Sequence, residues 1–192
     1  RSYGDSAVAE HVLAMQDLDW LQHWNPATGE LACAAGMSLD AVLAFVVPQG
    51  WFLPVTPGSR FVTLGGAVAS DVHGKNHHVH GTFGQHVRGL TLRLGNGERL
   101  SVSATEHPDL LAATCGGMGL TGVIEAVQLQ LVPLKSSTMH VTYHQLPNLT
   151  ALLASFTEHA QATYSVAWLD AWQGGAGLGR GVLMLGEHAT QG

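Results

Sequence analysis

The sequence has little positive charge, little cysteine and no long apolar run. Its eight Lys and Arg against fourteen Asp and Glu give a net charge of −6, which argues against nucleic acid as a partner, because phosphate backbones are bound by clustered cations. Two cysteines, Cys33 and Cys115, are too few for a disulfide framework. The longest apolar run, residues 41–47, is stopped by Pro48 and is far shorter than the roughly 20 residues that span a bilayer.

The rest of the composition is that of a folded protein. The 192 residues are 46% hydrophobic and 11% charged, which predicts a compact core and excludes a disordered chain. The low cysteine content makes a reducing compartment the default and leaves an oxidising one, such as the periplasm, open. The chain starts at Arg1 inside a glycine-containing turn and stops at Gly192 after a strand-like run, so we expect both ends to lie within a longer protein.

Short strand-like runs alternate with short helical runs, and this pattern predicts an α+β fold. Residues 18–36 read as a hairpin, and residues 87–104 read as a second hairpin around the Gly-Asn-Gly at 95–97. Ser38 is the predicted N-cap of a helix that ends before Pro48. Further helices are expected at 62–71, 107–114 and 146–160, and further strands at 51–55, 123–134, 139–146, 164–172 and after a glycine-rich loop at 174–181.

A change of composition near residues 134–137 is the predicted domain boundary. From Met139 the alternation of strands and helices starts again. We therefore expect a first domain over residues 1–136 and a second over residues 137–192.

Gly117, Gly119 and Gly122 have the spacing G-x-G-x-x-G of a dinucleotide-binding turn. That motif needs a strand before it, a helix after it and an acidic residue about 20 positions further on. Here a helix precedes, a strand follows, and position 142 is threonine, which excludes the dinucleotide fingerprint. The glycines then either let the backbone approach a flat ligand or form a tight helix-to-strand turn.

Two segments of small residues, RSYGDS at 1–6 and TLGGAVAS at 63–70, are candidates for binding an anion. Because cations are few, a bound pyrophosphate would have to be held by backbone N–H groups of a turn and of a helix N-terminus. Each segment taken alone is also typical of an ordinary turn.

Four histidines and one lysine lie in the stretch SDVHGKNHHVHG at 70–81. A zinc site would use ligands such as His78 and His80, but no cysteine pair or HExxH pattern accompanies them and Lys75 would repel a cation, so no metal is predicted. Two alternatives remain, a solvated loop and a turn in which His73 and Lys75 both face a cavity.

Several of these motifs together resemble a known family. In their order along the chain, RSYGDS, PGSRFVTLGGAVASDVHGKNHHVHGTFGQHV, CGGMGLTGVI and YSVAWLD are similar to the flavin oxidoreductases of the vanillyl-alcohol-oxidase superfamily, which have a PCMH-type FAD-binding fold. More closely, the chain resembles the decaprenylphosphoryl-β-D-ribose 2′-oxidase family, with HGKNHH as the specific motif. The resemblance implies a two-subdomain FAD-binding domain over residues 1–136, lacking its N-terminal part, and the truncated start of an α+β substrate domain over residues 137–192.

The resemblance also implies a set of site residues. Non-covalently bound FAD would be held by Arg1, Ser2, Tyr3, Gly4, Asp5, Ser6, Gly58, Thr63, Leu64, Gly65, Gly66, Ser70, Val72, His73, Gly74, Gly117 and Ile124. The binding would be non-covalent because the first loop offers Ser2 and Tyr3 where some superfamily members have a flavin-bonding histidine. Tyr3, His73, Lys75 and Trp168 would border the substrate cavity, and His77, His78, His80 and His86 would have supporting roles.

The implied reaction is oxidation of a sugar secondary alcohol to a ketone, in the epimerisation of decaprenylphosphoryl ribose for cell-wall arabinan synthesis. His73 suits the role of general base because imidazole titrates near neutral pH, and Lys75 suits a partner for the substrate phosphate or the reduced flavin. The base can also lie in the part of the family's fold that this chain lacks. If the protein consists of these 192 residues alone, we expect weak flavin retention and no turnover, and if it continues beyond them, we expect activity.

Two alternative functions stay open on the sequence. One is an FAD-linked alcohol or lactone oxidase with a soluble substrate, and the other is a non-catalytic module that keeps the flavin fold. For the sugar-lipid oxidase, the resemblance implies a short-chain reductase as partner and a place in the cytoplasm or at the inner membrane, with membrane association only through the substrate.

Overall fold

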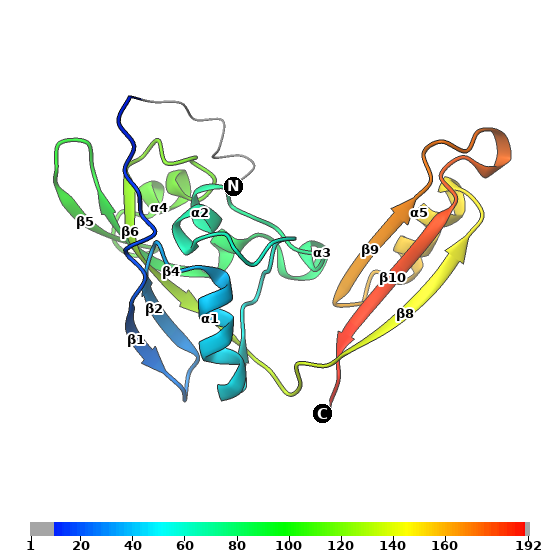
Figure 1. The fold of residues 1–192 in the computed structure, drawn as a ribbon, viewed down its shortest axis with the longest axis horizontal. Helices are drawn as coiled ribbons and strands as arrows, with labels where there is room; N and C mark the ends of the chain where they lie inside the picture. The colour runs from blue at the N-terminus through cyan, green and yellow to red at the C-terminus, as the bar shows by residue number, and fades with distance from the viewer. Residues whose placement is uncertain (1–9, 191–192) are drawn as a thin grey trace. The chain divides into compact units, whose positions relative to one another are not determined.

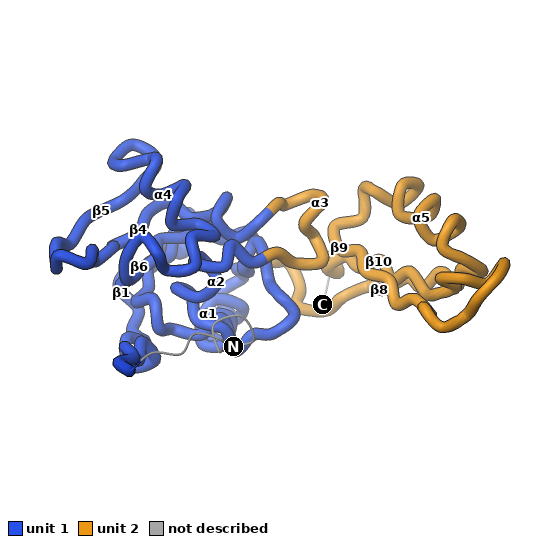
Figure 2. The backbone as a smooth tube through the Cα atoms, turned by 90° about the horizontal axis from the view of Figure 1, so that it is seen from above, with its two compact units in different colours: residues 1–72, 82–133 blue, residues 73–81, 134–192 orange. Residues whose placement is uncertain are grey.

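The computed structural model describes residues 10–190, which form two compact units (Figure 2). The first unit contains residues 10–72 and 82–133, and the second contains residues 73–81 and 134–190. The division falls after Pro133, close to the expected boundary. The segment 73–81 lies within the expected first domain but belongs to the second unit, where the Ser165 N–H donates to the Lys75 carbonyl at 2.9 Å.

Helices and strands alternate as the sequence predicts, which confirms the α+β class (Figure 1). The first unit contains β1 (Leu21–Asn25), β2 (Glu30–Ala34), α1 (Leu39–Val46), η2 (Val47–Gln49), β3 (Trp51–Phe52), α2 (Leu64–Ala69), η3 (Phe83–His86), β4 (Val87–Arg93), β5 (Arg99–Ser103), α4 (Pro108–Thr114), β6 (Val123–Gln130) and β7 (Val132–Pro133). The second contains α3 (His77–His80), β8 (Met139–Leu146), α5 (Leu149–Glu158), β9 (Tyr164–Leu169), η4 (Gly175–Gly177) and β10 (Gly181–His188). The sequence did not predict α3.

An antiparallel sheet in the order β1-β2-β6-β4-β5 forms the body of the first unit. Both predicted hairpins are present. Gly29, with φ of +74°, closes the β1–β2 turn and donates its N–H to the Asn25 carbonyl at 2.9 Å. Gly97, with φ of +86°, closes the β4–β5 turn. These positive φ angles favour glycine, which has no Cβ to clash with the backbone. The sequence could therefore locate both turns.

The helices α1 and α2 cover one face of this sheet (Figure 1). Their fully buried residues, Leu39, Val42, Val46, Leu64, Ala67 and Val68, pack with the sheet residues Leu31, Cys33, Leu92, Val127 and Leu129. Each large apolar side chain that is removed from water in this way contributes about 1.5–3 kcal/mol. The core thus fixes the position of α2 against β2 and β6.

Both of these helices begin at a side-chain cap. The Ser38 hydroxyl accepts a hydrogen bond from the Ala41 N–H, and the Thr63 hydroxyl accepts one from the Gly66 N–H, each at 3.1 Å. The first cap confirms the prediction for Ser38. The helix α1 ends at Val46, before Pro48, as predicted, and Pro48 lies in the 3₁₀ turn η2 that follows. It fits there because the first turn of a helix leaves the N–H that proline lacks without an internal acceptor.

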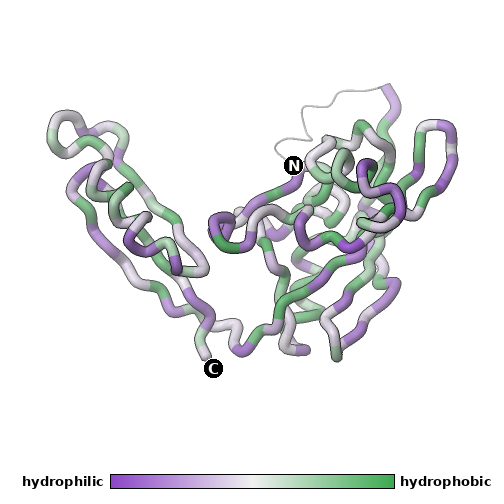
Figure 3. The backbone as a smooth tube through the Cα atoms, turned by 180° about the vertical axis from the view of Figure 1, so that it is seen from behind, coloured by the Kyte–Doolittle hydropathy of each residue, from purple (hydrophilic) through white to green (hydrophobic). Residues whose placement is uncertain are grey.

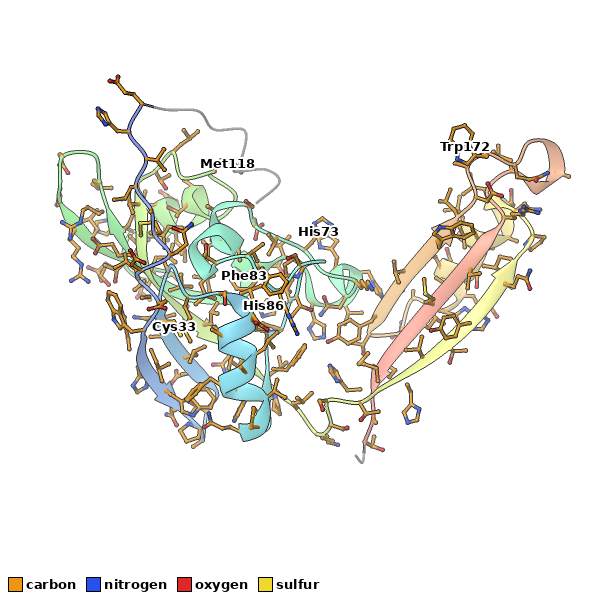
Figure 4. All side chains as sticks on the ribbon, viewed as in Figure 1. Cys33, His73, Phe83, His86, Met118 and Trp172 are labelled. Carbon is orange, nitrogen blue, oxygen red and sulfur yellow. The ribbon has the colours of Figure 1, made fainter. Side chains whose placement is uncertain are left out.

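The second unit is a three-stranded antiparallel sheet in the order β8-β10-β9, with α5 on one face. Leu183 and Leu185 alternate along β10 and pack with Leu152 of α5. The loop between β9 and β10 carries Trp172, whose side chain is 99% exposed (Figure 4). No helix among residues 10–190 is both long and apolar enough to cross a membrane.

Candidate functional site

The first unit contains a cavity of about 240 Å³ whose walls have few side chains. It is lined by Met15, Ala35, Thr63, Gly65, Gly66, Ala69, Gly119, Gly122, Val123 and Ile124. Six of these ten residues are glycine or alanine. Because nothing longer than a methyl group projects from them, the backbone of the walls is open to close approach by a ligand.

One wall is the first turn of α2, which is bound tightly to the chain that follows β2. The Gly65 N–H donates to the Ala35 carbonyl at 2.8 Å, and the Leu64 N–H donates to the Met37 carbonyl at 2.9 Å. A Cβ on Gly65 would lie 3.1 Å from the Cβ of Ala35, closer than nearly all Cβ contacts in proteins. Glycine at position 65 therefore permits the close packing that places Thr63 at the cavity.

These hydrogen bonds change the role that the sequence predicts for the start of α2. Its N–H groups are expected to hold a pyrophosphate. Instead, those of Leu64 and Gly65 donate to backbone carbonyls, and that of Gly66 donates to the Thr63 hydroxyl. The acceptors within the chain already satisfy three donors that a short helix normally leaves open. What α2 offers a ligand is a wall without side chains, together with the Thr63 hydroxyl.

The opposite wall is the loop that connects α4 to β6. It is joined to α2 by two hydrogen bonds, from the Gly116 N–H to the Val68 carbonyl at 3.0 Å and from the Met118 N–H to the Ala69 carbonyl at 2.8 Å. Met118, labelled in Figure 4, has φ of +52° and is 55% exposed. The two walls are thus held together by main-chain contacts that do not depend on side-chain identity.

Two glycines of this loop line the cavity. Gly119 has φ of +80°, and no atom lies within 4 Å of the position that its Cβ would occupy. Gly122 has φ of +144°, and its Cβ would lie only 2.6 Å from the Arg93 carbonyl. Gly122 is therefore required by packing, whereas Gly119 is open toward a ligand.

Four of the expected cofactor residues, Thr63, Gly65, Gly66 and Ile124, come together at this cavity. Leu64 is fully buried in the core and does not line the cavity. Within the described residues, the remaining expected positions of the first unit, Gly58, Ser70, Val72 and Gly117, do not line it. The expected pyrophosphate loop, residues 1–6, lies outside the described residues.

Packing explains why position 117 is glycine. A Cβ at this position would lie 2.2 Å from the Ala113 carbonyl at the end of α4. Such a contact is far inside van der Waals distance, so only glycine is accommodated. The G-x-G-x-x-G spacing therefore forms a helix-to-strand turn and also places Gly119 at the cavity. Approach of this backbone to a flat ligand stays a prediction.

Several lining residues were missed by the sequence-based assignment. Gly119 and Gly122 belong to the same glycine motif as Gly117, so their spacing was a signal, but the resemblance transferred only the first glycine. Ala35 gave no signal, because it reaches the cavity only where the chain after β2 binds to α2. Met15 lies before β1, where the sequence predicted no element.

Neither cysteine provides a nucleophile. Burial raises the pKa of the Cys33 thiol to about 12, and burial together with the nearby Asp71 raises that of Cys115 to about 11. Thiols with such pKa values are protonated at neutral pH and unreactive. Asp71 has a structural contact, because its Oδ1 accepts a hydrogen bond from the Gly84 N–H at 2.7 Å.

The expected substrate residues of the described chain all belong to the second unit. His73, labelled in Figure 4, and Lys75 lie in the segment 73–81, and both are exposed. The imidazole rings of His73 and His77 are 5.7 Å apart in an edge-to-face arrangement. Figure 3 shows the segment as largely hydrophilic. No group of three His, Cys, Asp or Glu side chains among residues 10–190 is placed to hold a metal ion.

Trp168 lies on β9 of the same unit and is 63% exposed. It lines a second cavity, of about 490 Å³, with Gln145, Leu146, Pro147, Asp170, Arg180, Gly181 and Val182. The Arg180 guanidinium forms an ion pair with Asp170 at 3.0 Å. Hydrogen bonding from the Trp172 backbone N–H holds the pKa of Asp170 low, and Arg180 and the Gln173 N–H add to this effect. The cavity combines an aromatic face with polar groups.

The first cavity fits part of a flavin nucleotide. Its glycine walls admit the ribityl chain of a flavin at backbone distance, the Thr63 hydroxyl supplies a polar contact, and Ile124, Val123 and Met15 supply apolar ones. Ligand sites of this kind are mostly apolar with a few placed polar groups. A larger side chain at Gly119 would project into space that is open in the structure.

Comparisons with known proteins agree with this fit. The model of a family described as "FAD binding domain" matches residues 1–103. The chain is 38% identical to the decaprenylphosphoryl-beta-D-ribose oxidase of Mycolicibacterium smegmatis, over 98% of this chain and 42% of that protein. It is 27% identical to the D-lactate dehydrogenase of Anaerostipes hadrus, over 71% of this chain and 30% of that protein. It is 28% identical to the mitochondrial D-2-hydroxyglutarate dehydrogenase of Bos taurus, over 77% of this chain and 28% of that protein.

The chain spans less than half the length of each of these relatives. The comparisons confirm the resemblance noted in the sequence and the FAD cofactor that it implies. Because the family model covers more than half of the 192 residues, the chain belongs to the FAD binding domain family of flavin-dependent oxidoreductases.

Proposed function

We propose that the protein oxidises a sugar secondary alcohol to a ketone with FAD, and that its substrate is the 2′-hydroxyl of decaprenylphosphoryl-β-D-ribose. The observation that carries the proposal is the glycine-walled cavity between α2 and the loop before β6, in a chain of the FAD binding domain family. The choice of substrate is supported by 38% identity over 98% of the chain to an oxidase of that name.

In this proposal the first unit holds the cofactor. Thr63, Gly65, Gly66, Gly119 and Ile124 line the cavity that receives part of the FAD. Residues 1–6 would complete the site, and the binding is non-covalent. When bound, FAD supplies a hydride acceptor for the carbon that is oxidised. Ile124 and Val123 form an apolar side of the cavity that would contact the bound cofactor.

The second unit provides the substrate residues in this proposal. An imidazole nitrogen of His73 takes the proton of the substrate hydroxyl, because a general base must accept that proton as the carbon loses hydride. The Lys75 ammonium pairs with the substrate phosphate. Trp168 offers an exposed aromatic face to the sugar, beside the polar groups of Gln145 and Arg180. The exposure of His73 and Lys75 supports these roles.

An absorbance experiment tests the proposal. The purified full-length protein that contains this chain should carry the flavin band at about 450 nm. Under anaerobic conditions, a short-chain polyprenylphosphoryl-β-D-ribose should bleach the band, and free ribose should not. A protein without the band after incubation with FAD would be a non-catalytic module, and the proposed function would fall.

A second candidate follows from the other relatives. Two of them are named as dehydrogenases of D-lactate and D-2-hydroxyglutarate, which are soluble 2-hydroxy acids. Bleaching by D-lactate or D-2-hydroxyglutarate, with no response to the polyprenyl sugar, would favour that substrate class. We give it second place because both identities are below 30%.

The proposed reaction requires a partner activity. A 2′-ketone is only the intermediate of an epimerisation, so a reductase must deliver hydride to the opposite face of the carbonyl. We propose a short-chain reductase for this step. Conversion of the ribosyl to the arabinosyl lipid on addition of such a reductase and its nicotinamide cofactor would support the pairing, and accumulation of the ketone in its presence would oppose it.

A further inference from the structure

The histidine-rich segment 73–81 is attached to the edge of the sheet in the second unit. Strand β9 is an edge strand in the order β8-β10-β9. On its open side, the Ser165 N–H donates to the Lys75 carbonyl at 2.9 Å. An edge strand normally leaves such a donor to solvent or to another chain. The segment therefore covers part of this edge, and the backbone of Lys75 is fixed directly to β9.

His78 makes a second attachment. Its Nε2 lies 2.8 Å from the carbonyl oxygen of Ala162, just before β9 begins. A carbonyl only accepts hydrogen bonds, so Nε2 must carry the proton and donate. The acceptor is itself held in place, because the Ala162 N–H donates to the His159 carbonyl at 3.0 Å and Ala162 packs against the core of this unit.

The fold of the segment connects the two attachments. The Asn76 carbonyl accepts hydrogen bonds from the N–H groups of Val79 and His80, which closes the single turn of α3. Asn76 is 1% exposed, whereas Lys75 and His77 on either side are exposed. The turn is thus fastened at Lys75, at the buried Asn76 and at His78.

We infer that His78 is a positioning residue for the substrate groups, fixing the segment 73–81 to the edge of β9 through its hydrogen bond to Ala162. The inference rests on the proposed function, in which His73 and Lys75 contact the sugar phosphate. Because Trp168 lies on the same strand, the bond from His78 keeps His73 and Lys75 in register with Trp168. His78 itself touches neither substrate nor cofactor.

The tautomer of His78 tests the geometry without any activity measurement. Long-range nitrogen–proton NMR spectra of the purified, ¹⁵N-labelled protein distinguish Nε2–H from Nδ1–H imidazoles. We expect His78 to be the Nε2–H form, and His78→Gln, whose side-chain amide can donate from a similar position, to leave the amide signals of Lys75 and Ser165 unchanged. An Nδ1–H tautomer would overturn the inference, because it would place a lone pair against the carbonyl.

Kinetics with a short-chain polyprenylphosphoryl-β-D-ribose and a dye acceptor test the positioning role. For His78→Ala we expect KM to rise about fivefold, the effect of one exposed hydrogen bond, with kcat and flavin content unchanged and with recovery in His78→Gln. The control is His140→Ala, which removes an exposed imidazole on β8 of the same unit. An unchanged KM in His78→Ala, or an equal rise in His140→Ala, would overturn the inference.

The two hypotheses can fail separately. If the unmodified protein binds no flavin or does not oxidise the sugar lipid, the proposed function is wrong, and the tautomer of His78 still decides the attachment. If the unmodified protein turns over and His78→Ala behaves like it, the function stands and the positioning role is wrong.

Discussion

Replacing Gly119 by alanine tests whether bound FAD contacts this residue, and the same replacement at Gly97 measures how much stability the change of backbone conformation alone costs. Gly119 lines the cavity with φ of +80°, and no atom of the protein lies within 4 Å of an added Cβ. Gly97 in the β4–β5 turn has φ of +86° and is equally open. The two glycines differ in their position: among the described residues, Gly119 lines the cavity and Gly97 does not.

The comparison of Gly119→Ala with Gly97→Ala gives the expected changes in stability and in FAD affinity. A non-glycine residue in the left-handed region costs about 1–2 kcal/mol, so both variants should lose a similar free energy of unfolding. For a chain of this length, that loss corresponds to a fall in Tm of about 2–8 °C. If FAD lies against the backbone at Gly119, the added methyl group prevents that approach. We expect the Kd for FAD to rise about tenfold or more, equivalent to about 1.4 kcal/mol, in Gly119→Ala alone.

The assay is fluorescence titration of the flavin-free protein and both variants with FAD, alongside thermal unfolding. A matched loss of stability with weaker FAD binding only in Gly119→Ala agrees with the proposed site. Equal FAD affinity in the two variants would refute it. Gly122 is unsuitable for this test, because its Cβ would clash with the Arg93 carbonyl and disturb the fold.

Three further predictions concern caps and titrating groups. Thr63→Ala and Ser38→Ala each remove an N-cap bond of 3.1 Å and should each cost about 1 kcal/mol in chemical unfolding, but only Thr63→Ala should also weaken FAD binding in titration. Burial raises the pKa of the Cys33 thiol from 9.0 to about 12. The contribution of this thiol to the free energy of unfolding is therefore fully present below pH 9 and is lost as the pH rises toward 12. Urea unfolding at rising pH should show a shallower decline of stability for Cys33→Ala than for the unmodified protein. Burial raises the pKa of Glu125, but hydrogen bonds from two arginines outweigh it and the net pKa lies below 4.5. Glu125→Gln should therefore lose about 0.5–1 kcal/mol at neutral pH, and equal stabilities of this variant and the unmodified protein at neutral pH would contradict the prediction.

Local sequence signals predicted most of the elements of the fold. The hairpins required positive φ at Gly29 and Gly97, and the first helix required a cap at Ser38, so residue type alone located them. The helix α3 was missed because HHVH has no apolar period and its turn begins at Asn76, whose burial the sequence did not indicate. Patterns of this kind depend on tertiary contacts that no local rule contains.

The candidate site was harder to predict than the fold. The sequence marked the start of α2 as an anion site because small residues open a helix there, but the carbonyls of Ala35 and Met37 take up two of the donors. Those acceptors lie about 30 residues earlier in the chain, and only the packing of α2 against the end of β2 brings them close. For the same reason, nothing in the local pattern distinguished Gly117, which packs against Ala113, from Gly119, which lines the cavity.

Amide hydrogen exchange with and without saturating FAD tests the central claim most directly. The claim is that the cofactor lies between the start of α2 and the loop that leads into β6. FAD should slow exchange at residues 63–66 and 119–124 and leave the β4–β5 turn at 94–98 unchanged. Bound FAD that protects neither of the first two segments would contradict the account.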